Sequence, residues 1–167
     1  RLNGEAGPRG IDIPIIDLAR PGRDDRCPTR RGMSRVPELM AAGVNVAFGH
    51  DCVMDPWYGM GSGDMLEVAH MGLHVAQMTS QAGIHQCFKA VTTHAAKVMH
   101  LPGYGLAPGC DASFVLLQAR DPVEAIRLRA TRLKVWRKGQ LLAETPAATA
   151  RLLVEGRAGE TSFMPNR

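Results

Sequence analysis

The stretch at residues 44–58, VNVAFGHDCVMDPWY, decides the fold, because an apolar run in it ends abruptly in His50 and Asp51. Residues 44–48 are rich in β-forming side chains without polar alternation, which indicates a strand buried on both faces of a parallel sheet. The carboxyl ends of parallel strands in an α/β barrel meet at one mouth, where catalytic groups lie. The stretch therefore predicts that Asp51 is the chemical centre of the chain.

Helix signals lie on both sides of this predicted strand. Residues 34–43 predict a helix with Ser34 as its N-cap and Gly43 at its C-terminal stop. Residues 64–81 predict a helix that is apolar on two faces, as in a helix sandwiched between layers. A further helix is expected at 84–101, so the pattern is that of an α/β protein.

The residue patterns at the two ends of the chain differ from the pattern in the middle. The opening residues contain one apolar island, IDIPIIDL at 11–18, in which Pro14 argues against a central strand and favours a short edge or loop segment. After Tyr104 the pattern changes to short β-like pieces. The elements expected there are strands at 112–117, 133–136 and 140–144, the last two joined as a hairpin, and a helix at 121–130.

The composition fits a globular protein and excludes several functional classes. Of the 167 residues, 45% are hydrophobic, which suits one domain or a partial domain. The net charge of +4 comes from arginines scattered among acids, so the basic face that nucleic-acid binding needs is absent. No apolar run approaches the ~20 residues of a membrane helix, and no secretory signal opens the chain, so we expect a cytoplasmic protein with reduced cysteines.

The residues around Asp51 leave alternatives open. Asp51 itself is either a metal ligand and proton acceptor or a cap in the following loop. His50 points to the opposite side of the strand and is expected to hydrogen-bond a loop rather than share a metal. Trp57 either walls one side of a planar ligand or plugs the barrel against the next helix. Cys52 has no identifiable base to activate it and is interpreted as a pocket-lining thiol.

The other histidines are interpreted as structural. His70 and His74 have the i, i+4 spacing that can hold one metal, but no Glu follows His70 as an HExxH motif requires. Packing or capping is therefore expected for this pair, and also for His94 and His100 at a predicted helix end. His85 is expected to be solvated.

Several segments together resemble a known family. They are RRG at 30–32, GVNVAFGHD at 43–51, DPWYGMG at 55–61 and HMGLHVAQM at 70–78. These segments are similar to the carboxyl-terminal half of bacterial cytosine deaminases, in the amidohydrolase superfamily. The segment at 92–117, TTHAAKVMHLPGYGLAPGCDASFVLL, resembles the broader superfamily, in which the last barrel helix returns the chain to a small β-sandwich. The resemblance covers residues 20–145.

The resemblance implies a fold, a reaction and a cofactor. Residues 1–103 would be the carboxyl-terminal portion of a metal-dependent (β/α)8 TIM-type barrel, and residues 104–167 part of a small β-sandwich domain with a tail. A metal-bound hydroxide would attack the ring carbon that bears an exocyclic amine, in cytosine or a related aminated heterocycle, and release ammonia. The cofactor would be one divalent ion, iron or zinc.

The resemblance also assigns roles to three residues. Asp51 matches the family's eighth-strand aspartate, which ligates the metal and takes the proton from the attacking water. Trp57 matches an aromatic residue near the pyrimidine pocket. Cys52 stands where these deaminases carry a second aspartate that touches the substrate. Because a thiol cannot replace a charged acceptor of two hydrogen bonds, another aminated or cyclic-amide heterocycle is an alternative substrate.

Much of the family's site has no counterpart in the sequence. None of the six histidines occurs in an HxH pair, and all lie at or after His50, so the ligand set is incomplete. A full barrel needs about 200 or more residues. We therefore expect a fragment, inactive alone, that either sits beside a missing amino-terminal half or associates with itself through the open edge of its strand. The alternative function is a catalytically inactive oligomerising or binding module.

Overall fold

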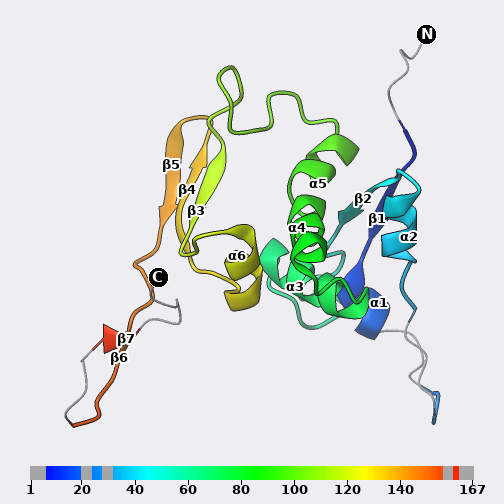
Figure 1. Cartoon of the computed structure of the whole chain (residues 1–167), viewed down its shortest axis with the longest axis horizontal. Helices are drawn as coiled ribbons and strands as arrows, with labels where there is room; N and C mark the ends of the chain where they lie inside the picture. Colours follow the sequence, from blue (N-terminus) through cyan, green and yellow to red (C-terminus); the bar gives the residue numbers. More distant parts are fainter. Residues whose placement is uncertain (1–6, 20–23, 28–31, 156–159, 162–167) are drawn as a thin grey trace.

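The computed structural model describes residues 7–19, 24–27, 32–155 and 160–161. Two parallel strands, β1 (Arg9–Asp12) and β2 (Asn45–Phe48), pair in register from Arg9↔Asn45 to Asp12↔Phe48. A separate antiparallel sheet in the order β3-β4-β5 lies on the other side of the molecule, with helix α6 between the two parts (Figure 1). The remaining elements are α1 (Pro14–Ala19), α2 (Val36–Ala41), α3 (Met65–Val75), α4 (Gln81–Ala90), α5 (Thr93–Val98), β3 (Phe114–Leu117), α6 (Pro122–Leu128), β4 (Arg132–Arg137), β5 (Gln140–Glu144), β6 (Ala150–Arg151) and β7 (Glu160–Thr161).

The strand at the centre of the sequence argument is confirmed. Val46, Ala47 and Phe48 of β2 are each at most 2% exposed, and the strand pairs in parallel with β1. The prediction for residues 11–18 was only partly right, because β1 ends at Asp12 and Pro14 then opens helix α1. Proline suits the first turn of a helix, where its missing N–H has no partner to lose.

The helix at 34–43 forms, but without the predicted cap. Helix α2 begins after Arg35, and no side chain caps it. Ser34 instead donates its backbone N–H to the carboxylate of Asp12 at 3.3 Å. Gly43 follows the helix with φ +82°, a left-handed conformation that glycine adopts without strain.

The two longer helices are shorter than predicted. Helix α3 ends at Val75, and Gln77 at φ +54° turns the chain away from the helical path. The helix expected at 84–101 is broken at Thr92 into α4 and α5. The Thr92 hydroxyl donates to the carbonyl oxygen of Phe88 at 2.7 Å, in a run of β-branched residues that fit poorly in a helix.

One hydrophobic core joins β2 to helices α3, α4 and α6. Val46 and Phe48 from β2 belong to it, with Val68 from α3, Cys87 from α4 and Ile126 from α6. Of these, Val68, Cys87 and Ile126 are fully buried. Helix α6 therefore packs on the first part of the chain, while the predicted domain boundary at residue 103 stays a prediction.

The three strands expected after residue 104 are present and antiparallel. Strand β4 pairs with β3 on one side and with β5 on the other. Lys138 and Gly139 turn the β4–β5 hairpin with φ +49° and +80°, the pair of positive angles typical of a two-residue hairpin turn. Among the described residues, no helix is long and apolar enough to cross a membrane.

Candidate active site at the carboxyl end of β2

The candidate site lies on the loop at residues 51–63, which we call the site loop. The loop begins beside the end of β1, because Gly49 donates its N–H to the carbonyl oxygen of Asp12 at 2.8 Å. Asp51 is exposed and has φ +64°. Aspartate tolerates this left-handed conformation better than most residues, because its short side chain bonds locally. The structure thus presents the predicted strand-end carboxylate to solvent.

His50 lies directly before Asp51 and is buried, with 8% of its surface exposed. Its Nδ1 lies 3.0 Å from the carbonyl oxygen of Cys52. A carbonyl oxygen only accepts, so Nδ1 carries the proton and donates. Nε2 is buried without a hydrogen-bond partner. The predicted hydrogen bond from His50 to a loop is confirmed.

Asp55 organises the turn in the middle of the site loop. Its Oδ1 accepts the backbone N–H groups of Trp57 and Tyr58, each at 3.0 Å. Burial would raise the pKa of Asp55, but the hydrogen bonds from Tyr58, Cys52 and Trp57 outweigh it and hold this pKa below its ordinary value. The Trp57 side chain is 63% exposed, so it does not plug against the next helix. Its role as a wall of a ligand pocket stays a prediction.

Cys52, the second residue of the site loop, is buried, with 8% of its surface exposed. Burial, followed by hydrogen bonding to Asp55 and the charge of Asp51, raises the pKa of its thiol to about 11. The thiol is therefore neutral near pH 7, and a neutral thiol is a poor nucleophile. The interpretation of Cys52 as a pocket-lining thiol stays a prediction.

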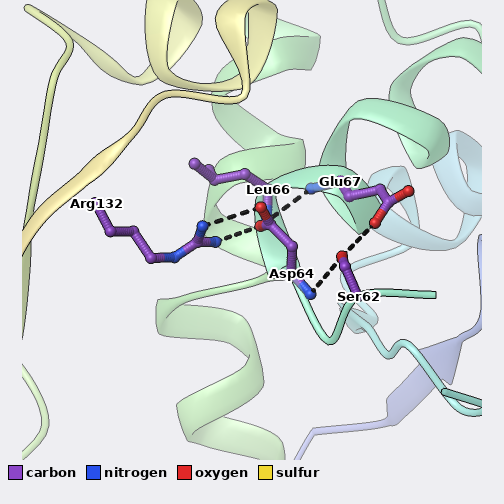
Figure 2. A network of polar contacts seen from close by, with 5 residues as sticks. All are labelled: Ser62, Asp64, Leu66, Glu67 and Arg132. Carbon is purple, nitrogen blue, oxygen red and sulfur yellow. Dashed lines mark hydrogen bonds and ion pairs between the residues drawn. The ribbon is translucent and has the colours of Figure 1, made fainter. Parts of the chain in front are cut away.

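The site loop ends on helix α3 in a polar network (Figure 2). Asp64 caps the helix by accepting the backbone N–H groups of Leu66 at 2.7 Å and Glu67 at 3.3 Å. The same carboxylate pairs with both terminal nitrogens of Arg132 on β4. The Ser62 hydroxyl donates to Glu67 at 2.5 Å and accepts the N–H of Asp64 at 3.2 Å. The network ties the loop, the helix and the antiparallel sheet together.

Two further carboxyl groups lie near the ends of the parallel strands. Asp12 is 3% exposed, and its Oδ2 has no hydrogen-bond partner. Burial raises the pKa of Asp17 on α1, and the charges of Asp12 and Asp51 raise it further. The sequence argument missed both residues because it interpreted 11–18 as a short edge or loop segment. The available signal was the presence of two acidic residues, Asp12 and Asp17, within this apolar island.

The described residues offer a metal ion only part of a site. Among them, no group of three His, Cys, Asp or Glu side chains is placed to hold a metal. Asp51 fits one ligand position, whereas a hydrolytic metal takes about three protein ligands. The rings of His70 and His74 instead contact each other at a tilt of 48°, with centroids 4.6 Å apart, and His74 donates to the carbonyl oxygen of His70 at 2.7 Å. His94 donates to the carbonyl oxygen of Val46 at 3.1 Å.

Comparison with known proteins identifies the family of this chain. The sequence pattern of the amidohydrolase family matches residues 6–143. The chain belongs to the amidohydrolase family. Its structure is similar to the crystal structure of 5-methylcytosine deaminase from Klebsiella pneumoniae liganded with 5-fluorocytosine, with a TM-score of 0.81 and 36% identity over 85% of this chain. A second similar structure is N-isopropylammelide isopropylaminohydrolase from Burkholderia multivorans, with a TM-score of 0.67 and 33% identity over 72% of this chain.

Similar sequences include a second deaminase and a second amidohydrolase. The pterin deaminase of Rhizobium rhizogenes is 30% identical over 138 residues, which are 80% of this chain and 31% of the relative. The N-isopropylammelide isopropyl amidohydrolase of Pseudomonas sp. is 28% identical over 116 residues, or 69% of this chain and 29% of the relative. The chain likewise covers 35% of the 5-methylcytosine deaminase chain and 31% of the Burkholderia enzyme. It therefore spans about a third of the length of these relatives.

Proposed function

We propose that this amidohydrolase chain is part of a hydrolytic deaminase that acts on cytosine or a related aminated heterocycle. Water attacks the ring carbon that bears the exocyclic amine, and ammonia leaves. The observation that supports this most is the 36% identity, over 85% of the chain, to a 5-methylcytosine deaminase whose structures hold 5-fluorocytosine and phosphonocytosine.

Asp51 is the residue that we propose for proton transfer and for metal binding. Its exposed carboxylate at the end of β2 is open to a reacting water, and it accepts the proton that this water gives up. The half-buried Asp17 lies close enough to Asp51 for the Asp51 charge to raise the pKa of Asp17, after burial and the charge of Asp12. We propose that Trp57 and Cys52 form parts of the substrate pocket wall.

A divalent ion, iron or zinc, supplies an ionised water at neutral pH when it is bound. Asp51 would provide one of its ligands, and residues that do not belong to this chain would provide the others. The chain alone is then inactive, because one carboxylate is too few protein ligands for a hydrolytic metal site.

We further propose that β1 and β2 are strands of a (β/α)8 barrel and that β3–β5 are part of a small β-sandwich. A parallel pair of strands is normally part of a larger sheet covered on both faces, and Ile11 on β1 is 60% exposed. The remaining barrel strands come from an amino-terminal part of the protein or from another chain.

A chimaera tests this proposal. In it, this chain replaces the matching third of the Klebsiella 5-methylcytosine deaminase, and ammonia release from cytosine and 5-methylcytosine is measured. We expect deamination and a bound divalent metal in the chimaera, and neither in its Asp51→Ala variant. Undiminished activity in the Asp51→Ala variant would sink the assignment.

Cys52 favours an alternative heterocycle as the substrate. With its pKa raised to about 11, the thiol is neutral and does not offer the charged acceptor of two hydrogen bonds that a carboxylate offers. The assay therefore includes pterin and an N-alkylated ammelide, the kinds of ring named for the relatives. If Cys52 turns the pocket away from cytosine, Cys52→Asp raises kcat/KM for cytosine more than for the other two rings; an equal or smaller gain for cytosine would contradict this role of Cys52.

A further inference from the structure

We propose that His50 is a positioning residue that holds Asp51 in its left-handed conformation, and this inference rests on the proposed function of Asp51. The imidazole of His50 bonds to the carbonyl oxygen of Cys52, so one hydrogen bond spans the residue between them. That residue, Asp51, has φ +64°. The bond therefore closes the backbone turn at Asp51, and this turn sets the direction of the Asp51 carboxylate.

The hydrogen bond from His50 to Cys52 forms only when the backbone turns between these two residues. In an extended strand, side chains stand perpendicular to the sheet, whereas carbonyl groups point along it toward the neighbouring strand. A side chain at residue 50 would then not face the carbonyl oxygen of residue 52. The distance of 3.0 Å between His50 Nδ1 and this oxygen is reached because Asp51 folds the chain back.

Gly61 keeps the imidazole ring in place from the other side. The site loop returns to the strand end, because Met54 donates its N–H to the carbonyl oxygen of Met60 at 2.8 Å. A Cβ atom on Gly61 would lie 2.6 Å from Cε1 of His50 and 3.1 Å from the carbonyl oxygen of Cys52. The glycine backbone thus packs directly against the ring and its hydrogen bond.

The same hydrogen bond requires a proton on Nδ1 of His50. Nδ1 donates to a carbonyl oxygen and must carry this proton, whereas Nε2 is buried without a hydrogen-bond partner. A side chain kept only for packing would avoid such an atom, because a buried polar group without a hydrogen bond is costly. The Nδ1 bond is the interaction that explains a histidine here.

Two substitutions separate the hydrogen bond from the ring. His50→Asn places an amide nitrogen near the position of Nδ1 and keeps a donor for Cys52. His50→Gln places its amide near the position of Nε2 and loses that donor. His85→Gln, at an exposed position on α4, is the matched control for a change of histidine to glutamine.

The first experiment is NMR spectroscopy on the full chain. The 15N shift of His50 Nδ1 is expected to show that this atom carries a proton. The couplings about the N–Cα bond of Asp51 are expected to show a positive φ. The positive φ is expected to persist in His50→Asn and to be lost in His50→Gln. An unprotonated Nδ1 in the wild-type chain, or a positive φ that survives in His50→Gln, overturns the inference.

The second experiment is steady-state deamination in the chimaera described above. We expect His50→Gln and Gly61→Ala to lower kcat about 10-fold, equal to about 1.4 kcal/mol of barrier, with KM changed less than about two-fold. His50→Asn is expected to stay within about three-fold of wild type. Equal loss in the Asn and Gln variants overturns the inference. If the wild-type chimaera releases no ammonia, the proposed function fails, and the NMR result still decides the role of His50.

Discussion

Asp64 has two roles at the end of the site loop. Each role makes its own contribution to the free energy of unfolding, and the two contributions can be measured separately. As the N-cap of α3 it accepts two backbone N–H groups, and a cap of this kind stabilises a protein by about 1 kcal/mol. As the partner of Arg132 it joins α3 to β4, with both terminal guanidinium nitrogens on one carboxylate. Arg132 is 37% exposed and Asp64 22%, so solvent screening limits this pair to roughly 0.5–1 kcal/mol.

These values predict a graded series of destabilisation. Asp64→Ala removes the cap and the ion pair and is expected to cost about 2 kcal/mol of unfolding free energy. Asp64→Asn keeps an oxygen for the cap and is expected to cost about 1 kcal/mol or less. The double-mutant cycle of Asp64→Asn with Arg132→Gln isolates the pair and is expected to give a coupling of roughly 0.5–1 kcal/mol. Urea unfolding measures each value.

The pH dependence of the coupling gives a second, independent check. Partial burial raises the pKa of Asp64, but the hydrogen bonds from Arg132 and Leu66 outweigh it, so this pKa lies below its ordinary value. A depressed carboxyl pKa stabilises the fold fully above the unfolded pKa of about 3.9, and this stability is lost as pH falls through the folded pKa. The coupling should therefore be constant from pH 5 to 8 and fall below pH 4.

The exposed pair of Arg35 and Glu38 is the matched control for this cycle. Their side chains are 81% and 55% exposed, and they join neighbouring turns of the chain rather than two parts of the fold. Their coupling is expected to be smaller than that of Asp64 with Arg132 and to vanish in high salt. An Asp64–Arg132 coupling no larger than this control at pH 7, or one that persists undiminished at pH 2, would refute the reasoning.

Three further predictions follow from buried positions. The neutral thiol of Cys52 should react with iodoacetamide at pH 7.5 far more slowly than the exposed Cys27, and mass spectrometry showing the reverse order would contradict the pKa of about 11. Gly72→Ala puts a Cβ 2.6 Å from Cε2 of Phe48 and should destabilise the chain by about 1 kcal/mol, whereas in a Phe48→Leu background it should become neutral or stabilising. Ile126→Ala should cost about 2–5 kcal/mol in urea unfolding, and a cost below about 1 kcal/mol would show that α6 does not share the core.

The sequence predicted those features that depend on local pattern. Strand β2 was predictable because an unbroken apolar run needs burial on both faces. Asp121 and Pro122 predicted the start of α6. In the structure, Asp121 caps this helix by accepting the backbone N–H of Glu124 at 2.8 Å. The position of Asp51 at the strand end followed from the same pattern, although its metal role stays a proposal.

The features that sequence reasoning missed depend on contacts between distant residues or on backbone turns. Arg132 and Asp64 are 68 residues apart, and no local pattern pairs them. The left-handed turn at Asp51 could not be predicted, because the residue that adopts it is not a glycine. The break at Thr92 depends on a hydroxyl bond that competes with the helix, and apolar periodicity does not detect it.

The most direct test of the central claim compares Asp51 with Asp51→Asn in the chimaera. Asparagine tolerates the left-handed conformation, so this substitution removes the charge and leaves the backbone turn in place. Ammonia release from cytosine and bound divalent metal are measured on the same samples. The account predicts that the wild-type chimaera binds metal and deaminates, and that Asp51→Asn loses at least about 100-fold in kcat/KM, within the range of general acid–base catalysis. Equal activity and equal metal content in the two proteins would contradict the claim that Asp51 is the chemical centre of this chain.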